Sequence, residues 1–293
     1  MISEKDSQYV TTDLAIESGV TAGAEGVEFD EREEGEFKIA VMRVKKGRGE
    51  EETGRPAGTY VTLTIGRPWL FDEAQSERAT DLISREIASL AGGISRCESV
   101  LVVGLGNRAL TADALGPEVA DGLLITRHIK LADEQLFRSL GQAEISSFAP
   151  GVLGQTGIET YELVRGAVQR VEPDLCIAVD ALAARGVDRL ATTVQLCDVG
   201  LSPGSGVGND RGALTRETLG VPVLAIGAPT VVNSATLVRD ALEVAGTREI
   251  SPELEEVLEN GRSFFVSLKE SDVAVAELSR IIAGAINRAF SKE

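Results

Sequence analysis

The sequence is poor in aromatic residues and in histidine. Phe, Trp and Tyr make up 4% of the 293 residues, and His128 is the single histidine. A core must therefore be built mainly from Val, Ile, Leu and Ala, within a hydrophobic share of 43%. One histidine excludes a histidine-rich zinc site, and a serine triad would have to use His128, which lies near a predicted helix end. We expect no metal and no cofactor, although a metal held by carboxylates alone is compatible with the sequence.

Cysteine is scarce as well, with three residues and no Cys-x-x-Cys spacing. Cys97, Cys176 and Cys197 lie in or next to apolar runs. This placement is typical of buried free thiols in a reducing compartment. A catalytic thiol would want a histidine partner, so we expect that none of the three is catalytic.

Long apolar runs and a signal-like N-terminus are also missing. No stretch approaches the roughly 18 continuous apolar residues of a transmembrane helix. Residues 1–17 are polar and charged, without a basic segment followed by an apolar core. We therefore expect a cytoplasmic protein with no membrane partner. The net charge of −17 repels phosphate backbones, so direct binding to nucleic acid is not expected.

The sequence does contain short apolar runs that alternate with helical patterns. Residues 1–36 are polar and acidic, and predict a flexible or loosely docked leader, while 46–58 predicts a turn-like connection. Strands are expected at 37–45, 59–66, 99–105, 144–148, 174–182, 189–198 and 221–232. Helices are expected at 72–91, 116–130, 159–171, from the end of the last strand to about 245, 252–260 and 272–290. The pattern favours a three-layer α/β fold, phosphorylase/hydrolase-like, with a mostly parallel sheet and helices on both faces.

Two aspartates lie where α/β sheets form their sites, at the carboxyl ends of strands. Asp180 directly follows the apolar run 177–179, and Asp113 lies between two alanines in the loop after the 99–105 strand. A carboxylate in apolar surroundings is costly unless it is paired, hydrogen-bonded or protonated. Two together share a proton, so that one can act as a base on water and the other as an acid. The pair suits amide hydrolysis, and the alternative for each residue alone is a helix N-cap.

Other chemistries match less well. The Gly-Leu-Gly-Asn at 104–107 resembles part of a dinucleotide-binding fingerprint, but Ala109 stands where a third glycine is expected, and no GxxxxGK[ST] loop occurs. Ser205 lies among glycines without the arrangement of a nucleophile elbow. Three alternatives stay open. A metal-assisted peptidase predicts chelator sensitivity, an inactive binding protein predicts no cleavage, and a nucleotide-binding enzyme predicts stabilisation by nucleotide.

Six blocks of the sequence, in one order, are similar to the germination protease, or spore protease, family. They are VVGLGN-x4-ADALGP, LLITRH, APGVLGQTGIET, AVDALAAR, SPGSGVGN and ETLGVPVLAIGAPTVV. The similarity runs from TTDLAIE near the N-terminus to IIAGAINRAF near the C-terminus, with a compact segment at 247–263 where the family has a longer insertion. The resemblance implies a fold like that of hydrogenase-maturation endopeptidases. It carries two functional aspartates over onto Asp113 and Asp180, and Asn107 or loop amides would orient the pair or stabilise an oxyanion.

The resemblance also implies how the protein works. Family members degrade small acid-soluble spore proteins during germination, are made as zymogens that process themselves, and form tetramers. The segment Thr12–Glu17 looks like a tethered copy of the substrate in a mobile leader.

We therefore expect self-cleavage between Asp13 and Leu14 under mildly acidic conditions. A propeptide of residues 1–13 would be released from a single α/β peptidase domain, 14–293, in a homotetramer of the forespore or spore core. The alternative is that Leu14 and Ile16 merely dock on the surface, with Asp13 as a cap.

Overall fold

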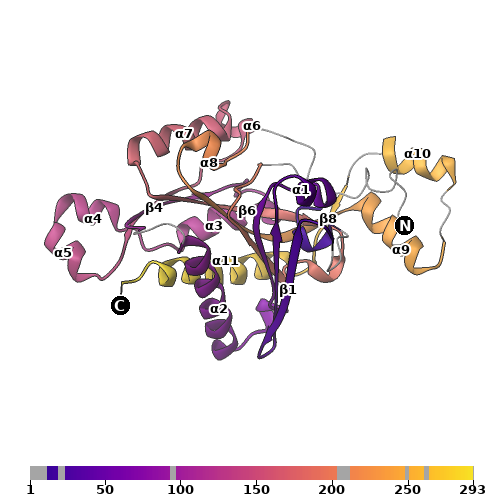
Figure 1. Ribbon diagram of the computed structural model, residues 1–293, viewed down its shortest axis with the longest axis horizontal. Coiled ribbons are helices and arrows are strands. Elements are labelled where there is room, and N and C mark those ends of the chain that lie inside the picture. Colours follow the sequence, from indigo (N-terminus) through magenta and orange to yellow (C-terminus); the bar gives the residue numbers. More distant parts are fainter. Residues whose placement is uncertain are drawn as a thin grey trace.

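The computed structural model describes residues 12–18, 24–92, 97–202, 212–247, 251–260 and 264–292. Over these residues the chain forms a nine-stranded sheet with helices packed against it (Figure 1). The strand order is β1-β2-β3-β7-β8-β6-β4-β5, with β9 paired to β8. The strands are β1 Val27–Glu34, β2 Phe37–Val44, β3 Gly58–Thr64, β4 Ser99–Gly104, β5 Glu144–Phe148, β6 Leu175–Ala184, β7 Thr193–Cys197, β8 Val223–Asn233 and β9 Phe265–Val266.

Helices fill most of the connections between the strands. They are α1 Arg48–Thr53, α2 Glu73–Ala91, α3 Leu115–Asp121, α4 Arg127–Ala132, α5 Glu134–Ser139, α6 Leu153–Thr156, α7 Thr160–Val171, α8 Arg216–Leu219, α9 Ser234–Val244, α10 Pro252–Asn260 and α11 Ser271–Ala289. Short 3-10 turns are η2 Ala15–Glu17, η3 Pro68–Leu70, η4 Thr111–Asp113 and η5 Val187–Arg189.

Four neighbouring strands, β5, β4, β6 and β8, run parallel to one another. β4 and the first half of β6 are buried, as their unbroken runs of Val, Leu, Ile and Ala predict. Parallel strands present their carboxyl ends at one edge of the sheet. That edge carries Gly104 at the end of β4 and Asp180 in β6, where Asp180 is in register with Gly227 of β8.

The expectation of a mostly parallel sheet is wrong, because the sheet is mixed. β1, β2, β3 and β7 pair antiparallel, and β7 joins β8 antiparallel as well. The expectation of a loose leader is wrong for 27–34, which is strand β1. A two-residue turn, with Gly35 at φ +60°, connects β1 to β2 and fixes their pairing. The expected turn at 46–58 also contains helix α1.

Helices cover both faces of the sheet. One core packs α2, α3 and α11 against β2, β3, β4 and β8, and is rich in Ile, Leu and Val. A second core, on the other face, packs α7 and α8 against β4 and β6. The expected helices at 72–91, 159–171 and 272–290 agree with α2, α7 and α11 to within one residue at each end.

The single helix expected at 116–130 is wrong. Helix α3 ends at Asp121, and α4 begins at Arg127 after a connection that is fixed by Thr126. The buried Thr126 Oγ1 donates to the carbonyl oxygen of Ala143 (2.6 Å) and accepts the N–H of Ile145 (2.8 Å). These bonds tie the connection to β5 and direct α4 away from the course of α3.

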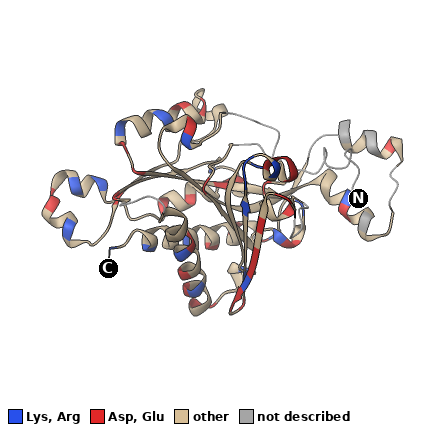
Figure 2. Ribbon diagram, in the orientation of Figure 1, with Lys and Arg blue, Asp and Glu red and all other residues tan. Residues whose placement is uncertain are grey.

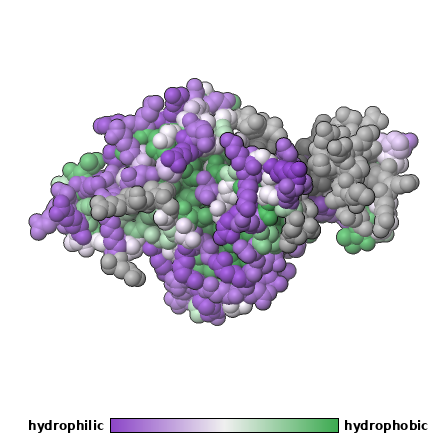
Figure 3. Space-filling view, viewed as in Figure 1, coloured by the Kyte–Doolittle hydropathy of each residue, from purple (hydrophilic) through white to green (hydrophobic). Residues whose placement is uncertain are grey.

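The surface is strongly acidic along the β1–β2 hairpin, where Asp and Glu side chains follow one another (Figure 2). Some of them pair with basic residues in or directly after β2, as in Asp30–Arg43 (3.1 Å) and Glu28–Lys45 (2.7 Å). Apolar side chains gather near the centre of the same view, framed by hydrophilic ones (Figure 3). Within the described part of the chain, no helix is both long and apolar enough to cross a membrane.

Candidate active site

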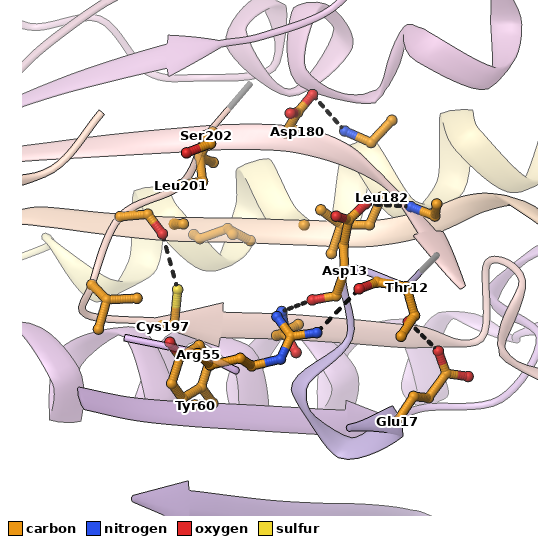
Figure 4. A pocket seen from close by; sticks show the side chains of 18 of the residues that line it. Thr12, Asp13, Glu17, Arg55, Tyr60, Asp180, Leu182, Cys197, Leu201 and Ser202 are labelled. Carbon is orange, nitrogen blue, oxygen red and sulfur yellow. Dashed lines mark hydrogen bonds between the residues drawn. The ribbon is translucent and has the colours of Figure 1, made fainter. Parts of the chain in front are cut away.

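A cleft of about 1400 Å³ opens along the sheet edge that carries Asp180. Its walls come from β3, β6, β7, β8 and the η4 turn, and Thr12, Asp13 and Glu17 of the N-terminal segment also line it (Figure 4). Asp113 and Asp180 both line the cleft, together with Asp13. The topology thus brings together the two aspartates that the sequence singled out, although they lie far apart along the chain.

Asp180 lies in β6, where its Oδ1 accepts the N–H of Ala181 (2.9 Å). Burial raises the pKa of Asp180 well above its usual value, and the nearby charges of Asp113 and Asp13 raise it further. The hydrogen bond from Ala181 opposes the shift but is the smallest of these effects. Asp180 therefore favours its protonated form, and the N-cap alternative does not describe it, because it lies within a strand.

Asp113 ends the η4 turn, and its Oδ2 accepts the backbone N–H of Asn107 (2.8 Å). Burial raises the pKa of Asp113, while the bond from Asn107 lowers it. Thr230 of β8 donates to the carbonyl oxygen of Ala112 (2.6 Å) and ties this turn to the sheet. Asp113 does not cap helix α3, whose N-cap is Ala114 without a side-chain hydrogen bond.

Asn107 contacts the site through its main chain. Its N–H holds Asp113, whereas its side-chain Oδ1 accepts hydrogen bonds from the N–H of Ala109 (3.0 Å) and from Gln155 Nε2 (2.8 Å). The role expected for Asn107 in orienting the pair stays a prediction. Its side-chain oxygen is bound to groups of the neighbouring loops.

Gly104, in the Gly-Leu-Gly-Asn segment, and Gly116 allow close packing of helix α3 on the sheet. A side chain at Gly104 would collide with the carbonyl oxygen of Gly116, and one at Gly116 would collide with the carbonyl oxygens of Leu105 and Val179. The start of α3 thus packs directly on β4 and β6. Neither position can accept a side chain without moving the helix away from the strands.

The segment at 12–18 is firmly docked, which corrects the expectation of a mobile leader there. Asp13 pairs with the end of β6: its N–H donates to the carbonyl oxygen of Ala183 (2.9 Å), and its Oδ2 accepts the N–H of Ala183 (2.8 Å). Leu14 is fully buried among Ala184, Leu190 and Val232. The segment docks because Leu14 and Ala15 are apolar and can be buried. The prediction of a mobile leader rested on the polar residues around them. Residues 1–11 lie outside the described residues.

Two residues that the sequence did not single out hold this segment. Gln195 of β7 accepts the N–H of Ala15 (2.5 Å) and donates to the carbonyl oxygen of Asp13 (3.0 Å). Arg55 donates to the carbonyl oxygens of Thr12 (3.1 Å) and Leu14 (3.0 Å) (Figure 4). A polar Gln inside the otherwise apolar run of β7 was the available signal.

Glu17 anchors the far end of the segment. Its carboxylate accepts the N–H groups of Arg185 (2.8 Å) and Gly186 (3.0 Å), and Arg189 lies 3.4 Å away. With Asp13 at one end and Glu17 at the other, both acidic side chains of the segment bind the β6 end and the turn after it.

The remaining candidates lie elsewhere or lack reactivity. His128 is in helix α4 and does not line the cleft, and Ser205 lies outside the described residues. Burial raises the pKa of the Cys97 and Cys176 thiols to about 12 and that of Cys197 to about 11, away from thiolate character. Over the described ranges, no group of three or more His, Cys, Asp and Glu side chains is arranged to hold a metal ion.

An α/β fold with two half-buried aspartates of raised pKa in a cleft that a peptide segment helps to line defines a candidate peptide hydrolase. Residues 8–247 match the germination protease family model. The chain belongs to the germination protease family, which makes it a peptidase of the spore germination class.

Curated relatives agree with this family. The germination protease of Caldanaerobacter subterraneus subsp. tengcongensis is 40% identical over 284 residues, covering 88% of this chain and 87% of the relative. That of Clostridium acetobutylicum is 37% identical, covering 96% and 95%, and that of Bacillus subtilis is 42% identical, covering 82% and 68%. A solved [NiFe] hydrogenase maturation protease, HycI from Thermococcus kodakarensis KOD1, matches at 18% identity and a TM-score of 0.31 over 60% of this chain and 99% of its own.

Proposed function

We propose that this chain is an endopeptidase that starts the degradation of small acid-soluble spore proteins, with Asp113 and Asp180 as its water-activating pair. The observation that carries the proposal is the cleft itself. Its lining includes the two half-buried aspartates beside a peptide segment, and the charge of Asp113 adds to the raised pKa of Asp180.

The different surroundings of the two carboxyls assign their roles. Asp180 has the more strongly raised pKa and keeps its proton, so it is the acid. Asp113 is stabilised as a carboxylate by the N–H of Asn107, so it is the base. Asp113 takes a proton from water as the water oxygen attacks the peptide carbonyl carbon. Asp180 gives its proton to the leaving nitrogen as the C–N bond breaks, and proton return from Asp113 resets the pair.

The docked segment supports a zymogen. Thr12, Asp13 and Glu17 line the cleft on the side of β6, so the docked segment would restrict the binding of an external substrate until it leaves. Processing between Asp13 and Leu14 would release residues 1–13. Mild acid would favour the cut, because the carboxyl pair must hold a shared proton to work. A homotetramer in the cytoplasm of the forespore or spore core completes the proposal.

The test compares the full-length chain with Asp113→Asn and Asp180→Asn, and with Asp121→Asn as an exposed control that lies outside the cleft. Each dyad variant should lose cleavage of a small acid-soluble spore protein by about 10²–10⁴-fold, the usual contribution of a general acid or base. The control should keep the normal rate, and circular dichroism should show all three folded.

N-terminal sequencing after incubation near pH 5 follows self-processing in the same samples. The wild type should yield a chain that starts at Leu14, and Asp180→Asn should stay intact. Near-normal rates in both folded dyad variants would end the aspartic mechanism, and a mature chain starting elsewhere would end the proposed cut.

A further inference from the structure

Residues 12–15 are held in the cleft through their main chain. The side-chain amide of Gln195 binds one carbonyl and one N–H, of Asp13 and Ala15. The Arg55 guanidinium binds two carbonyls, of Thr12 and Leu14. Four main-chain groups of one short stretch are thus bound by side chains that lie far away in the sequence.

Such contacts do not depend on the side chains of the bound peptide. Every residue except proline offers the same N–H and carbonyl groups. A side-chain amide that spans residues i and i+2 also fixes the register of an extended chain, as the main chain of a neighbouring strand would. Gln195 here spans the bond between Asp13 and Leu14, with one contact on each side of it.

Gln195 is built to hold a peptide. Its side chain is 7% exposed, and among the described residues both hydrogen-bond partners of its amide belong to the docked segment. Once the segment leaves, this amide loses both of these protein partners at the cleft that it lines, where another peptide can form the same two hydrogen bonds. Arg55 adds a positive charge, partly buried, whose Nη2 likewise binds two carbonyls of the segment.

We propose that Gln195 and Arg55 form a main-chain clamp that sets which bond of a substrate protein is cut. This inference rests on the proposed function and on the cut between Asp13 and Leu14. Gln195 Nε2 donates to the carbonyl of the residue before the cut bond, and Gln195 Oε1 accepts the N–H of the second residue after it. Arg55 donates to the carbonyls of the residues that correspond to Thr12 and Leu14. The clamp therefore selects unfolded segments whose main-chain groups are free to bind, and rejects proline at the second position after the cut.

A binding experiment separates the clamp from the chemistry. The full-length chain carries Leu14→Asp, which prevents burial of that side chain and frees the cleft, and Asp180→Asn, which stops cleavage. A labelled synthetic peptide with the sequence of residues 8–20 is titrated by fluorescence anisotropy. A second peptide has lactic acid in place of the residue equivalent to Ala15, which replaces that N–H with an ester oxygen.

Gln195→Met in this background should weaken binding of the amide peptide by about tenfold, as expected for the loss of two hydrogen bonds. The ester should weaken binding to the parent by about fivefold and to Gln195→Met by less than about twofold, because the acceptor is already gone. Gln142→Met, a glutamine outside the cleft, should behave as the parent. Gln195→Glu keeps an acceptor and loses the donor, so it should bind weakly yet remain sensitive to the ester.

An ester penalty of equal size in the parent and in folded Gln195→Met would overturn the clamp. So would parent-like affinity in Gln195→Glu, which covers the case that the Met variant does not fold. Cleavage of the peptide by this Asp180→Asn background, detected by mass spectrometry, would instead contradict the proposed chemistry. The binding comparison would still report on the clamp.

Discussion

Asp180 is stabilised in the protonated form, and this lowers the free energy of unfolding at neutral pH. The folded-state pKa is raised above the unfolded value of 3.8, so the folded chain binds more protons than the unfolded chain in the interval between the two. Stability is therefore greatest below the unfolded pKa and falls as the pH rises through the folded pKa. Active sites often keep such unfavourable groups because the chemistry needs them.

Replacing Asp180 with Asn should therefore stabilise the chain while removing activity. At pH 7 we expect Tm to rise by about 2–4 °C, equivalent to about 1 kcal/mol for a chain of this size. The difference should disappear below about pH 4, where Asp180 is protonated in both states. Differential scanning fluorimetry from pH 3.5 to 8 measures the Tm of the wild type and the variant. Mass spectrometry confirms that the chains are uncut. A variant that is no more stable than wild type at pH 7 would contradict the assigned burial cost.

The cysteines give a second residue-scale prediction. Because burial raises all three thiol pKa values to about 11 or 12, the triple variant C97A/C176A/C197A should keep specific activity within about threefold of wild type. Its Tm should fall by a few degrees, since Cys176 and Cys197 are buried. Activity per folded molecule is the measurement. Complete loss in a folded triple variant would point to a thiol mechanism.

Among the elements, the start of helix α3 decides how the two carboxyls meet. Gly116 packs against the carbonyl oxygens of Leu105, directly after β4, and of Val179 in β6, so α3 and the η4 turn before it can approach the strand that carries Asp180. A methyl group at this position must push the helix outward. The turn with Asp113 would move with it.

Gly116→Ala should thus lower both stability and cleavage, by about 1–3 kcal/mol for the overpacked contact and by roughly 10²-fold in rate for a displaced carboxyl. Gly166→Ala is the matched control, because Gly166 is exposed within α7 and an added methyl meets nothing within 4 Å. It should stabilise the chain by about 0.5–1 kcal/mol through helix propensity. Denaturant unfolding and initial rates report both variants, and equal behaviour of the two would refute the packing argument.

Local patterns predicted the elements whose structure is set locally. Apolar residues that recur with a period of 3.6 predicted helices α7 and α11. The unbroken apolar run before Asp180 predicted strand β6, with Asp180 in its carboxyl half. Strand β1 was not predicted, because its exposed acidic residues look like a polar leader and its hydrogen bonds come from β2. Gln195 and Arg55 were not predicted either, since Gln195 meets Asp13 across 182 residues of sequence. No local period encodes such a contact.

At the scale of the whole molecule, charge opposes folding. The chain carries a net charge of −17, and acidic side chains crowd the β1–β2 hairpin. Although several pair with basic residues, exposed pairs contribute little, so mutual repulsion of the excess negative charge should dominate.

Added salt should therefore stabilise this protein. Between roughly 0.05 and 0.5 M NaCl the Debye length falls severalfold, and we expect Tm to rise on the order of a few degrees at pH 7. KCl and choline chloride should give the same rise, because screening does not depend on the identity of the cation. A fall in Tm, or an effect confined to one cation, would show that ion pairs or a specific ion site dominate instead.

The complete burial of Leu14 has a consequence for the state of the cleft after the first cut. Hydrolysis of the bond before Leu14 would create a new α-amino group, which carries a positive charge below about pH 8. The Thr12 hydroxyl, which accepts the N–H of Leu14 before the cut, would depart with residues 1–13, so the ammonium would lose this partner. The freshly made N-terminus would thus tend to leave the cleft and take Leu14 with it. Self-cleavage would thus both release residues 1–13 and move the new N-terminus out of the cleft. A substrate protein could then bind in its place.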